Sequence, residues 1–126
     1  MKLNISELFI TQDKCIFDAL SIINEKEIQI ALVVDIKNKL VGTITDGDIR
    51  RGLLKGLGLD SPLEKVTNKN FQSINFLDDR NKANMIMKKY GINMVPILDN
   101  NGEVIEQWGG TSDRKLEKVL ERSLNK

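Results

Sequence analysis

The sequence predicts an α+β fold of two β-α-β-β-α units that pack together with pseudo-two-fold symmetry. A helical pattern followed by an apolar strand, a polar turn and a second apolar strand occurs twice along the 126 residues. The two copies come into phase at a shift of about 64 residues, which places Val33-Val34-Asp35 over Ile97-Leu98-Asp99. Neither unit can bury a sheet alone, so we expect the two to share a core and to leave clefts between them.

The first unit is predicted from hydrophobic periodicity. Apolar residues recur at spacings of three and four after Asp13, which predicts an amphipathic helix with this residue near its N-cap. Gly56 and Gly58 are expected to end a second helix. The predicted order is a lead-in over 1–12, a helix over 13–27 with Ile16, Phe17, Ala19, Leu20 and Ile23 on one face, strands over 28–34 and 40–45 around a turn at 35–39, a helix over 46–57 and a short helical connector from 60 to 63.

The second unit repeats this order. Asp78 or Asp79 is expected to cap its first helix, and Gly91 is expected to end that helix. The predicted elements are an extended segment over 71–76, a helix with Ala83, Ile86, Met87 and Tyr90 on its inner face, strands over 93–98 and 104–108 around a turn at 99–102, and a last helix over 115–124 with Leu116, Val119, Leu120 and Leu124 on one side.

Composition and charge exclude several classes of function. The net charge of +1 is too small for the basic surface that nucleic-acid binding usually needs. The chain has no histidine and one cysteine, Cys15, so it lacks the commonest general base and the ligands of a structural zinc site. Its N-terminal residues lack the apolar core of a signal peptide, and no apolar run reaches membrane-spanning length. We therefore expect a cytoplasmic, non-enzymatic domain that binds no metal, nucleic acid or membrane.

The most informative stretch joins the second strand of the first unit to its second helix. It reads Leu40-Val41-Gly42-Thr43-Ile44-Thr45-Asp46-Gly47-Asp48-Ile49-Arg50-Arg51. A strand that enters a helix N-terminus collects free N–H groups and the positive end of the helix dipole, which suits an anion or a hydroxyl-rich ligand. Thr45 and Asp48 also approximate a capping box, which would stabilise the helix without any ligand. The two interpretations are compatible, because a capped terminus is also a preorganised donor site.

This doubled unit resembles a tandem pair of CBS domains (a Bateman module) over about residues 5–112. The stretch from Gly42 to Arg51 is similar to the family pattern of glycine, two residues, threonine or serine, two residues and aspartate. The hairpin Val95-Pro96-Ile97-Leu98-Asp99-Asn100-Asn101-Gly102 is similar to the family's apolar-Pro-apolar-apolar-Asp strand and turn. The resemblance implies one Bateman module, with repeats over 1–66 and 67–126.

A narrower resemblance concerns the enzyme that such a module accompanies. Residues 30–35 followed by 42–54 resemble the CBS pairs attached to sugar-phosphate nucleotidyltransferases, and a close variant occurs in those of sugar-phosphate isomerases. This resemblance implies that the chain controls an attached or partner nucleotidyltransferase.

The family resemblance also implies a ligand, an adenine nucleotide such as AMP, ADP or ATP. Thr45 would offer its hydroxyl to a phosphate or ribose oxygen, and Asp48 would accept hydrogen bonds from the ribose hydroxyls. Arg51, or failing it Arg50, would reach a phosphate. The adenine slot would be lined by Ile92, Met94 and Pro96, with Ile74 behind them.

The second repeat departs from the pattern at its most specific positions. Glu106, Gly109 and Ser112 stand opposite Gly42, Thr45 and Asp48, Asp113 is one step from the ribose position, and Leu32 stands opposite Pro96. We therefore expect one competent cleft, formed by Thr45 and Asp48 with the strand of the second repeat, and an empty or degenerate cleft at the mirror-related place.

Two further functions remain open at this point. The second helix of each unit could pair with a second copy of the chain through Leu53, Leu54, Leu57, Leu116, Val119 and Leu120, and the family commonly forms such homodimers. A ligand-free structural dimerisation module is the main alternative to a nucleotide sensor. A free-standing enzyme is a distant third, because no serine elbow or phosphate-binding loop is present and Asp46 with Asp48 is weak support.

Overall fold

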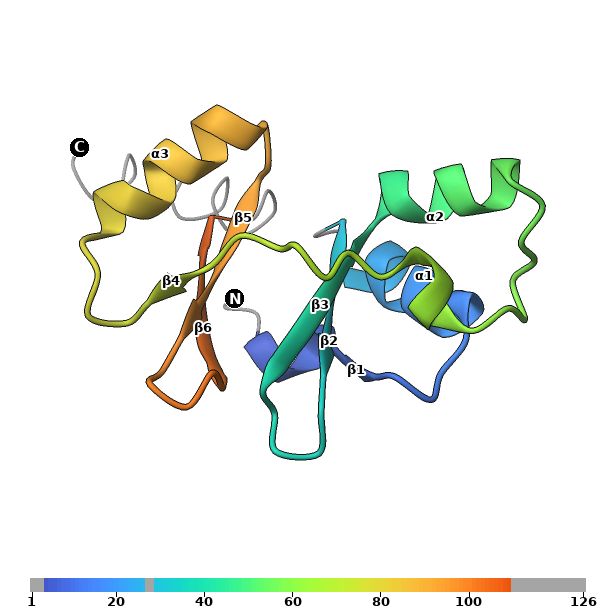
Figure 1. The fold of residues 1–126 in the computed structure, drawn as a ribbon, viewed down its shortest axis with the longest axis horizontal. Helices are drawn as coiled ribbons and strands as arrows, with labels where there is room; N and C mark the ends of the chain where they lie inside the picture. The colour runs from blue at the N-terminus through green and yellow to red at the C-terminus, as the bar shows by residue number, and fades with distance from the viewer. Residues whose placement is uncertain (1–3, 27–28, 110–126) are drawn as a thin grey trace, which may run out of the picture.

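The structure, a computed structural model, describes residues 4–26 and 29–109, which fold into helices and two small three-stranded sheets (Figure 1). This arrangement confirms the predicted α+β fold. The elements in chain order are the 3-10 turn η1 (Ile5–Leu8), β1 (Phe9–Thr11), α1 (Ile16–Lys26), β2 (Ile30–Val34), β3 (Leu40–Thr45), α2 (Asp46–Leu54), the 3-10 turn η2 (Leu63–Val66), β4 (Ile74–Asn75), α3 (Arg80–Tyr90), β5 (Met94–Leu98) and β6 (Val104–Gly109).

The internal repeat is visible in the sheet topology. The orders are β1-β2-β3 and β4-β5-β6, and each sheet joins a parallel pair to an antiparallel hairpin. The shift of 64 residues holds at the bounds of α1 and α3, of β2 and β5, and of β3 and β6. Both hairpins also contain a register irregularity at the same place, between Val33 and Val34 and between Ile97 and Leu98.

The two hairpin turns use the same aspartate hydrogen bonds. Asp35 Oδ1 accepts the N–H groups of Lys37 and Lys39 at 2.8 and 2.9 Å. Asp99 Oδ1 accepts the corresponding N–H groups of Asn101 and Glu103, both at 2.9 Å. This side chain therefore replaces backbone acceptors inside the turn, which is the usual reason for an aspartate there.

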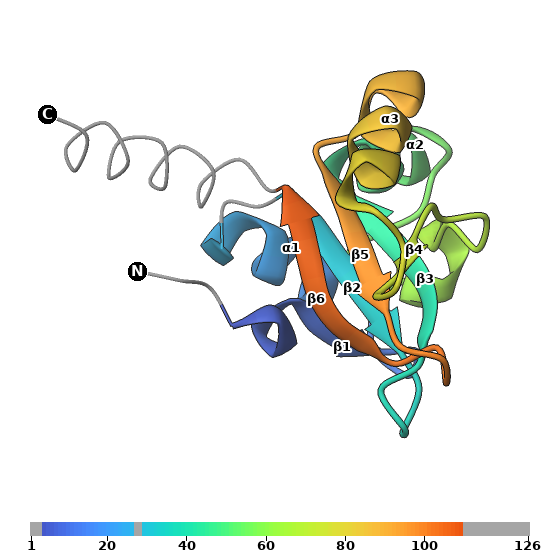
Figure 2. The same cartoon turned by 90° about the vertical axis from the view of Figure 1, so that its left-hand side faces the viewer.

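The repeats pack sheet against sheet, with the helices on the outside. Figure 1 shows α1 and α2 on one flank and α3 on the other, and Figure 2 views the molecule from the flank of α3. A core between the sheets draws on both repeats and consists of Leu8, Leu32, Val34, Leu40, Met94 and Val104. Burial of each such side chain contributes about 1.5–3 kcal/mol, so the shared core holds the two repeats together.

Backbone hydrogen bonds join the repeats at the hairpin tips. Leu40 N–H donates to Gly102 O at 3.0 Å, and Val104 N–H donates to Asn38 O at 3.2 Å. The two turns are therefore fixed to one another at the end of the molecule where the hairpins turn.

Several boundaries differ from those predicted. The lead-in contains β1, whose shortness hid it: three residues show no usable alternation. Helix α1 begins at Ile16 rather than Asp13, because Asp18 accepts the N–H of Cys15 at 3.0 Å at the helix start. Phe17 is 55% exposed and so does not belong to the inner face.

Helix α2 ends at Leu54, three residues earlier than predicted, and Gly56 follows at φ 101°. Leu57 is partly buried against the core of the first repeat, so it is not an exposed contact residue. Tyr90 is half exposed rather than on the inner face of α3. The predicted helix over 115–124, with its apolar side, lies outside the described residues, and the division of the chain after residue 66 stays a prediction.

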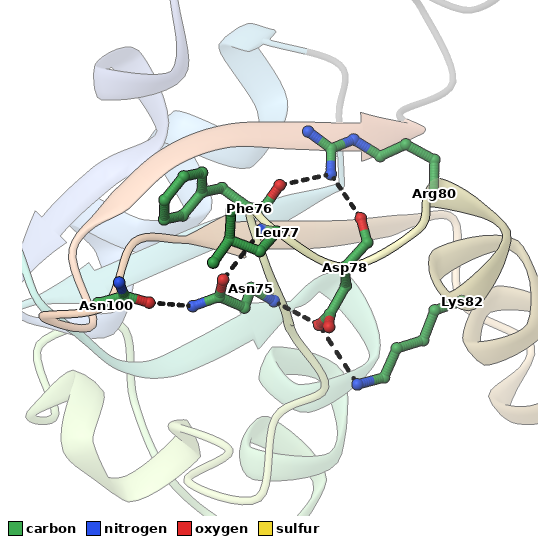
Figure 3. A network of polar contacts seen from close by, with 7 residues as sticks. All are labelled: Asn75, Phe76, Leu77, Asp78, Arg80, Lys82 and Asn100. Atoms are coloured by element: carbon green, nitrogen blue, oxygen red, sulfur yellow. Dashed lines mark hydrogen bonds and ion pairs between the residues drawn. The ribbon is translucent and has the colours of Figure 1, made fainter.

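The loop before α3 resolves the choice between two caps. Asp79 is the N-cap and accepts the N–H of Asn81 at 2.8 Å. Asp78 instead joins the loop to β4 and α3, since Oδ2 accepts from Asn75 N at 2.8 Å and from Lys82 Nζ at 3.3 Å (Figure 3). The hydrogen bond from Asn75, and then that from Lys82, lowers the pKa of Asp78. Gly91 ends the helix as predicted, at φ 65°.

Candidate functional site

A cleft of about 880 Å³ opens between the repeats. One wall is the end of β3 with the first turns of α2, and the other is the end of α3 with the start of β5. The volume is in the range of small-molecule binding sites. The lining residues are Gln29, Ile30, Thr43, Thr45, Asp46, Gly47, Arg50, Arg51, Asn68, Asn70, Phe71, Gln72, Tyr90, Gly91, Ile92, Asn93, Met94 and Pro96.

The capping box at the start of α2 is confirmed. Thr45 Oγ1 accepts the N–H of Asp48 at 3.2 Å, and Asp48 Oδ2 accepts the N–H of Thr45 at 2.9 Å. The Thr45 hydroxyl also donates to Oδ2 at 2.9 Å. These bonds fix both side chains at the cleft wall and are worth about 0.5–2 kcal/mol to the helix. The cap and a binding role remain compatible, because the N–H groups of Asp46 and Gly47 have no intrahelical acceptor.

Two arginine–aspartate pairs stand beside the cap. Arg51 Nη2 donates to Asp48 Oδ1 at 2.8 Å, and Arg50 pairs with Asp46 one turn earlier in the helix. The Arg51 side chain is 66% exposed whereas that of Asp48 is 19% exposed. Asp48 is therefore fixed, and Arg51 is free to turn toward a ligand at small cost, since exposed ion pairs contribute only about 0–1 kcal/mol.

Gly42 brings the segment between the repeats against the cleft. The N–H of Thr43 donates to Asn68 O at 3.0 Å, and the N–H of Asn68 donates to Thr43 O at 2.8 Å. A Cβ on Gly42 would lie 2.3 Å from Thr67 Cγ2 and 3.1 Å from Asn68 O. Only glycine therefore lets this segment run beside β3 and carry Asn68, Asn70 and Phe71 into the cleft wall.

Three of the four residues predicted to line an adenine slot lie at the cleft. Ile92, Met94 and Pro96 line the cleft. Met94 is 4% exposed and Pro96 is fully buried, so only a small part of each of these two side chains faces the cleft, at its floor. Ile74 lies in the core of the second repeat, paired with Ile97, and does not reach the cleft. Asp48 is not a lining residue either, and it meets the cleft through Thr45 and Arg51.

The sequence interpretation missed most of the polar and aromatic lining. The amides of Asn68, Asn70 and Gln72 come from the segment between the repeats, and Phe71 lies among them. Tyr90 comes from the last turn of α3. The only sequence signal for these residues was their place between the two repeats, because a segment that joins two packed repeats must cross the cleft between them.

The second repeat cannot reproduce the threonine cap at the equivalent place. Gly109 stands opposite Thr45 with φ 93°, and a Cβ there would lie 2.4 Å from Asn93 O. Glu106 stands opposite Gly42, and its carboxylate lies 3.7 Å from Arg80 Nη2. Ser112 and Asp113 lie outside the described residues, so the degenerate mirror-related cleft stays a prediction.

The described ranges 4–26 and 29–109 also bear on metal binding and membrane insertion. They contain no group of three or more histidine, cysteine, aspartate or glutamate residues that could hold a metal ion. No helix in this part of the chain is long and apolar enough to cross a membrane.

Comparison with known proteins identifies the class of fold. The CBS domain family model matches residues 8–55, from the end of η1 through α2. A CBS domain protein from Pyrobaculum aerophilum complexed with AMP has a TM-score of 0.72 at 19% identity, over 85% of this chain and 87% of that chain. The CBS domain pair of protein MJ0100, in complex with 5′-methylthioadenosine and S-adenosyl-L-methionine, has a TM-score of 0.71 at 25% identity, over 87% of this chain and 88% of that chain.

Residues 8–55 are thus matched as a CBS domain, and the described structure has the fold of a CBS domain pair. An uncharacterized protein of Helicobacter pylori strain J99 is 34% identical over 89 residues, which are 70% of this chain and 27% of that protein. The chain therefore spans about a quarter of the length of this relative.

Proposed function

We propose that the chain is a non-catalytic regulatory module that binds an adenine nucleotide between its two repeats. The observation that carries this proposal is the cleft of about 880 Å³, which combines Thr45 and Arg51 of the first repeat with Ile92 and Met94 of the second. A ligand there would touch both repeats at once. The structural neighbours support an adenosine-containing ligand, because one is complexed with AMP and the other with 5′-methylthioadenosine and S-adenosyl-L-methionine.

The proposed pose follows the polarity of the two walls. The adenine lies against Ile92 and the exposed edge of Met94, and the ribose and 5′ end face Thr45 and the first turn of α2. Asp48 Oδ1 accepts a ribose hydroxyl once Arg51 turns from this oxygen to the phosphate. Because the Arg51–Asp48 pair is largely exposed on the arginine side, this exchange of partners is cheap.

Regulation requires that the ligand favour one arrangement of the repeats over another. A nucleotide held by β5 and by the start of α2 stabilises the arrangement in which the two sheets pack together. We propose that the resulting shift between arrangements of the repeats is transmitted to an attached or partner enzyme. The resemblance of residues 30–35 and 42–54 to nucleotidyltransferase-linked modules makes a sugar-phosphate nucleotidyltransferase the enzyme to test first.

Calorimetric titration of the chain with AMP, ADP and ATP tests the binding proposal. Asp48→Asn keeps an oxygen that can cap α2 but removes the charge that accepts the ribose hydroxyls, so we expect at least a tenfold loss of affinity. Asp79→Asn is the matched control, because it changes an N-cap aspartate at the start of α3, outside the cleft. Equal affinities of wild type and Asp48→Asn would remove Asp48 from the site, and no binding of any nucleotide would refute the proposal.

Exposed leucines on α2 favour a second candidate, a structural dimerisation module. Leu53 is 40% and Leu54 is 82% exposed, and both lie on the helix predicted to form a dimer surface. Sedimentation of the wild type and Leu54→Glu separates the two candidates. A dimer that the substitution dissociates, together with a melting temperature that no nucleotide raises, would favour the structural role, since a ligand at 100 times its Kd should add about 2.7 kcal/mol.

A further inference from the structure

The charges at the phosphate end of the cleft are balanced by the protein itself. Asp46 and Asp48 lie in the first turn of α2, and each pairs with an arginine of the same helix, Arg50 and Arg51 respectively. Asp46, Arg50 and Arg51 line the cleft, and Asp48 lies behind Arg51 as its partner. Counted with this partner, the four side chains sum to zero charge. The arginines therefore offer no surplus positive charge to a ligand, because turning one toward the cleft leaves a carboxylate behind.

The rest of the cleft supplies no further cation within the described part of the chain. The other lining residues are uncharged, and five of them are amides: Gln29, Asn68, Asn70, Gln72 and Asn93. Lys69 is next to two of these amides but pairs with Glu64 at 3.3 Å. Lys89, next to the lining residue Tyr90, lies over the Tyr90 ring at 5.3 Å from its centroid.

We propose that this cleft selects an adenosine derivative whose 5′ substituent carries at most one phosphate, and that Asp46 acts against the triphosphate. The inference rests on the proposed nucleotide site and names its ligand class. One phosphate can be met by Arg51 and the free N–H groups at the start of α2. The additional phosphates of ATP would lie near the carboxylate of Asp46, which lines the cleft and repels them, and would contact no unpaired cation in the described part of the chain.

Electrostatics gives the size of the effect. AMP carries a charge of about −2 and ATP about −4 at neutral pH, so ATP meets about twice the repulsion from a given carboxylate. At separations of several ångströms in a partly solvated cleft, one carboxylate changes the affinity for ATP by roughly threefold to tenfold. Because the groups are exposed, added salt should weaken this discrimination.

The test compares AMP and ATP by calorimetry at low ionic strength without magnesium, in the wild type, Asp46→Asn and Glu64→Gln. Asp46→Asn frees Arg50, and we expect it to raise ATP affinity by roughly threefold to tenfold and AMP affinity by about half as much on a logarithmic scale. Glu64→Gln is the matched control, because it removes the same charge from an exposed ion pair outside the cleft, with Lys69.

The outcomes separate this inference from the proposed function. Wild-type binding of AMP tighter than ATP, with a ratio that falls by roughly twofold to threefold in Asp46→Asn and stays in Glu64→Gln, supports the inference. Binding of ATP as tightly as AMP, or an equal ratio in the wild type and Asp46→Asn, overturns it while the nucleotide site stands. If neither AMP nor ATP binds the wild type, the proposed function fails first.

Discussion

Both repeats contain the same two hairpin strands, yet they differ at the end of the second strand, where the first repeat lines the cleft. Both turns are built on the same aspartate hydrogen bonds, and both hairpins are irregular at the same position. At the end of the second strand, however, the first repeat has Thr45 and a capped helix, and the second has Gly109 in a left-handed conformation. The difference indicates that the hairpins are needed for the fold of either repeat. The capping box of Thr45 and Asp48 is a separate feature that only the first repeat has at this position.

The largest expected effect comes from alanine at the equivalent positions 42 and 106. In Gly42→Ala the new Cβ would lie 2.3 Å from Thr67 Cγ2, so we expect a loss of about 2–4 kcal/mol in the free energy of unfolding. Glu106→Ala removes only an exposed ion pair with Arg80, and we expect a change within about 0.5 kcal/mol. Urea denaturation of both variants measures the difference.

The same pair also tests the position of the cleft. Gly42→Ala pushes the segment at Asn68 away from β3 and should weaken AMP binding, whereas Glu106→Ala should leave it unchanged. Two variants of equal stability and equal affinity would contradict the asymmetry between the repeats.

The smallest expected effect is the loss of stability at acid pH that comes from Asp35 and Asp99 in the two hairpin turns. We expect this loss to be alike in the two repeats. The hydrogen bond from Lys39 N–H is the main cause that lowers the pKa of Asp35. Burial is the largest single influence on Asp99 and raises its pKa. The hydrogen bonds with the N–H groups of Glu103, Asn101 and Gly102 and with the Glu103 side chain together outweigh burial and lower the pKa. A lowered folded pKa stabilises the protein above the ordinary aspartate value of about 3.9, and this contribution disappears as the pH falls through the folded pKa.

NMR titration of the two carboxyl groups checks this prediction. Both should titrate below the ordinary aspartate value, and the Asp35→Asn and Asp99→Asn variants should each lose part of the acid dependence of unfolding. A carboxyl group that titrates at or above the ordinary value in one repeat would show that the turns are not equivalent.

The sequence predicted the scaffold because its signals are local. The turn at Asp35 and its counterpart at Asp99, the glycine stop at Gly91 and the apolar strands each follow from neighbouring residues, and the structure contains all of them. The short strand β1 was missed, because its three residues pair only with the distant β2. Helix α1 began later than predicted for a related reason, since the aspartate that caps it acts from inside the helix.

Of the residues that line the candidate cleft, the sequence indicated mainly those that belong to one local motif. Thr45 and Arg51 line the cleft as expected, and the capping box follows from two residues three apart. Ile74 was assigned to the slot from its place in the repeat, but its pairing with Ile97 turns it into the core. The amides and Phe71 of the segment after η2 could not be assigned, because their place depends on how Gly42 lets that segment run beside β3.

The most direct measurement of the central claim is methionine-methyl NMR with AMP. Met94 lies at the floor of the cleft, whereas Met85 is 71% exposed on α3 and Met87 packs against the core of the second repeat. Nuclear Overhauser contacts from the adenine protons to the Met94 methyl group, with none to Met85 and one AMP bound per chain, are the predicted result. An adenine ring that contacts neither Met94 nor Ile92, or saturation at two AMP per chain, would contradict a single cleft between the first repeat's capped helix and the second repeat's strand.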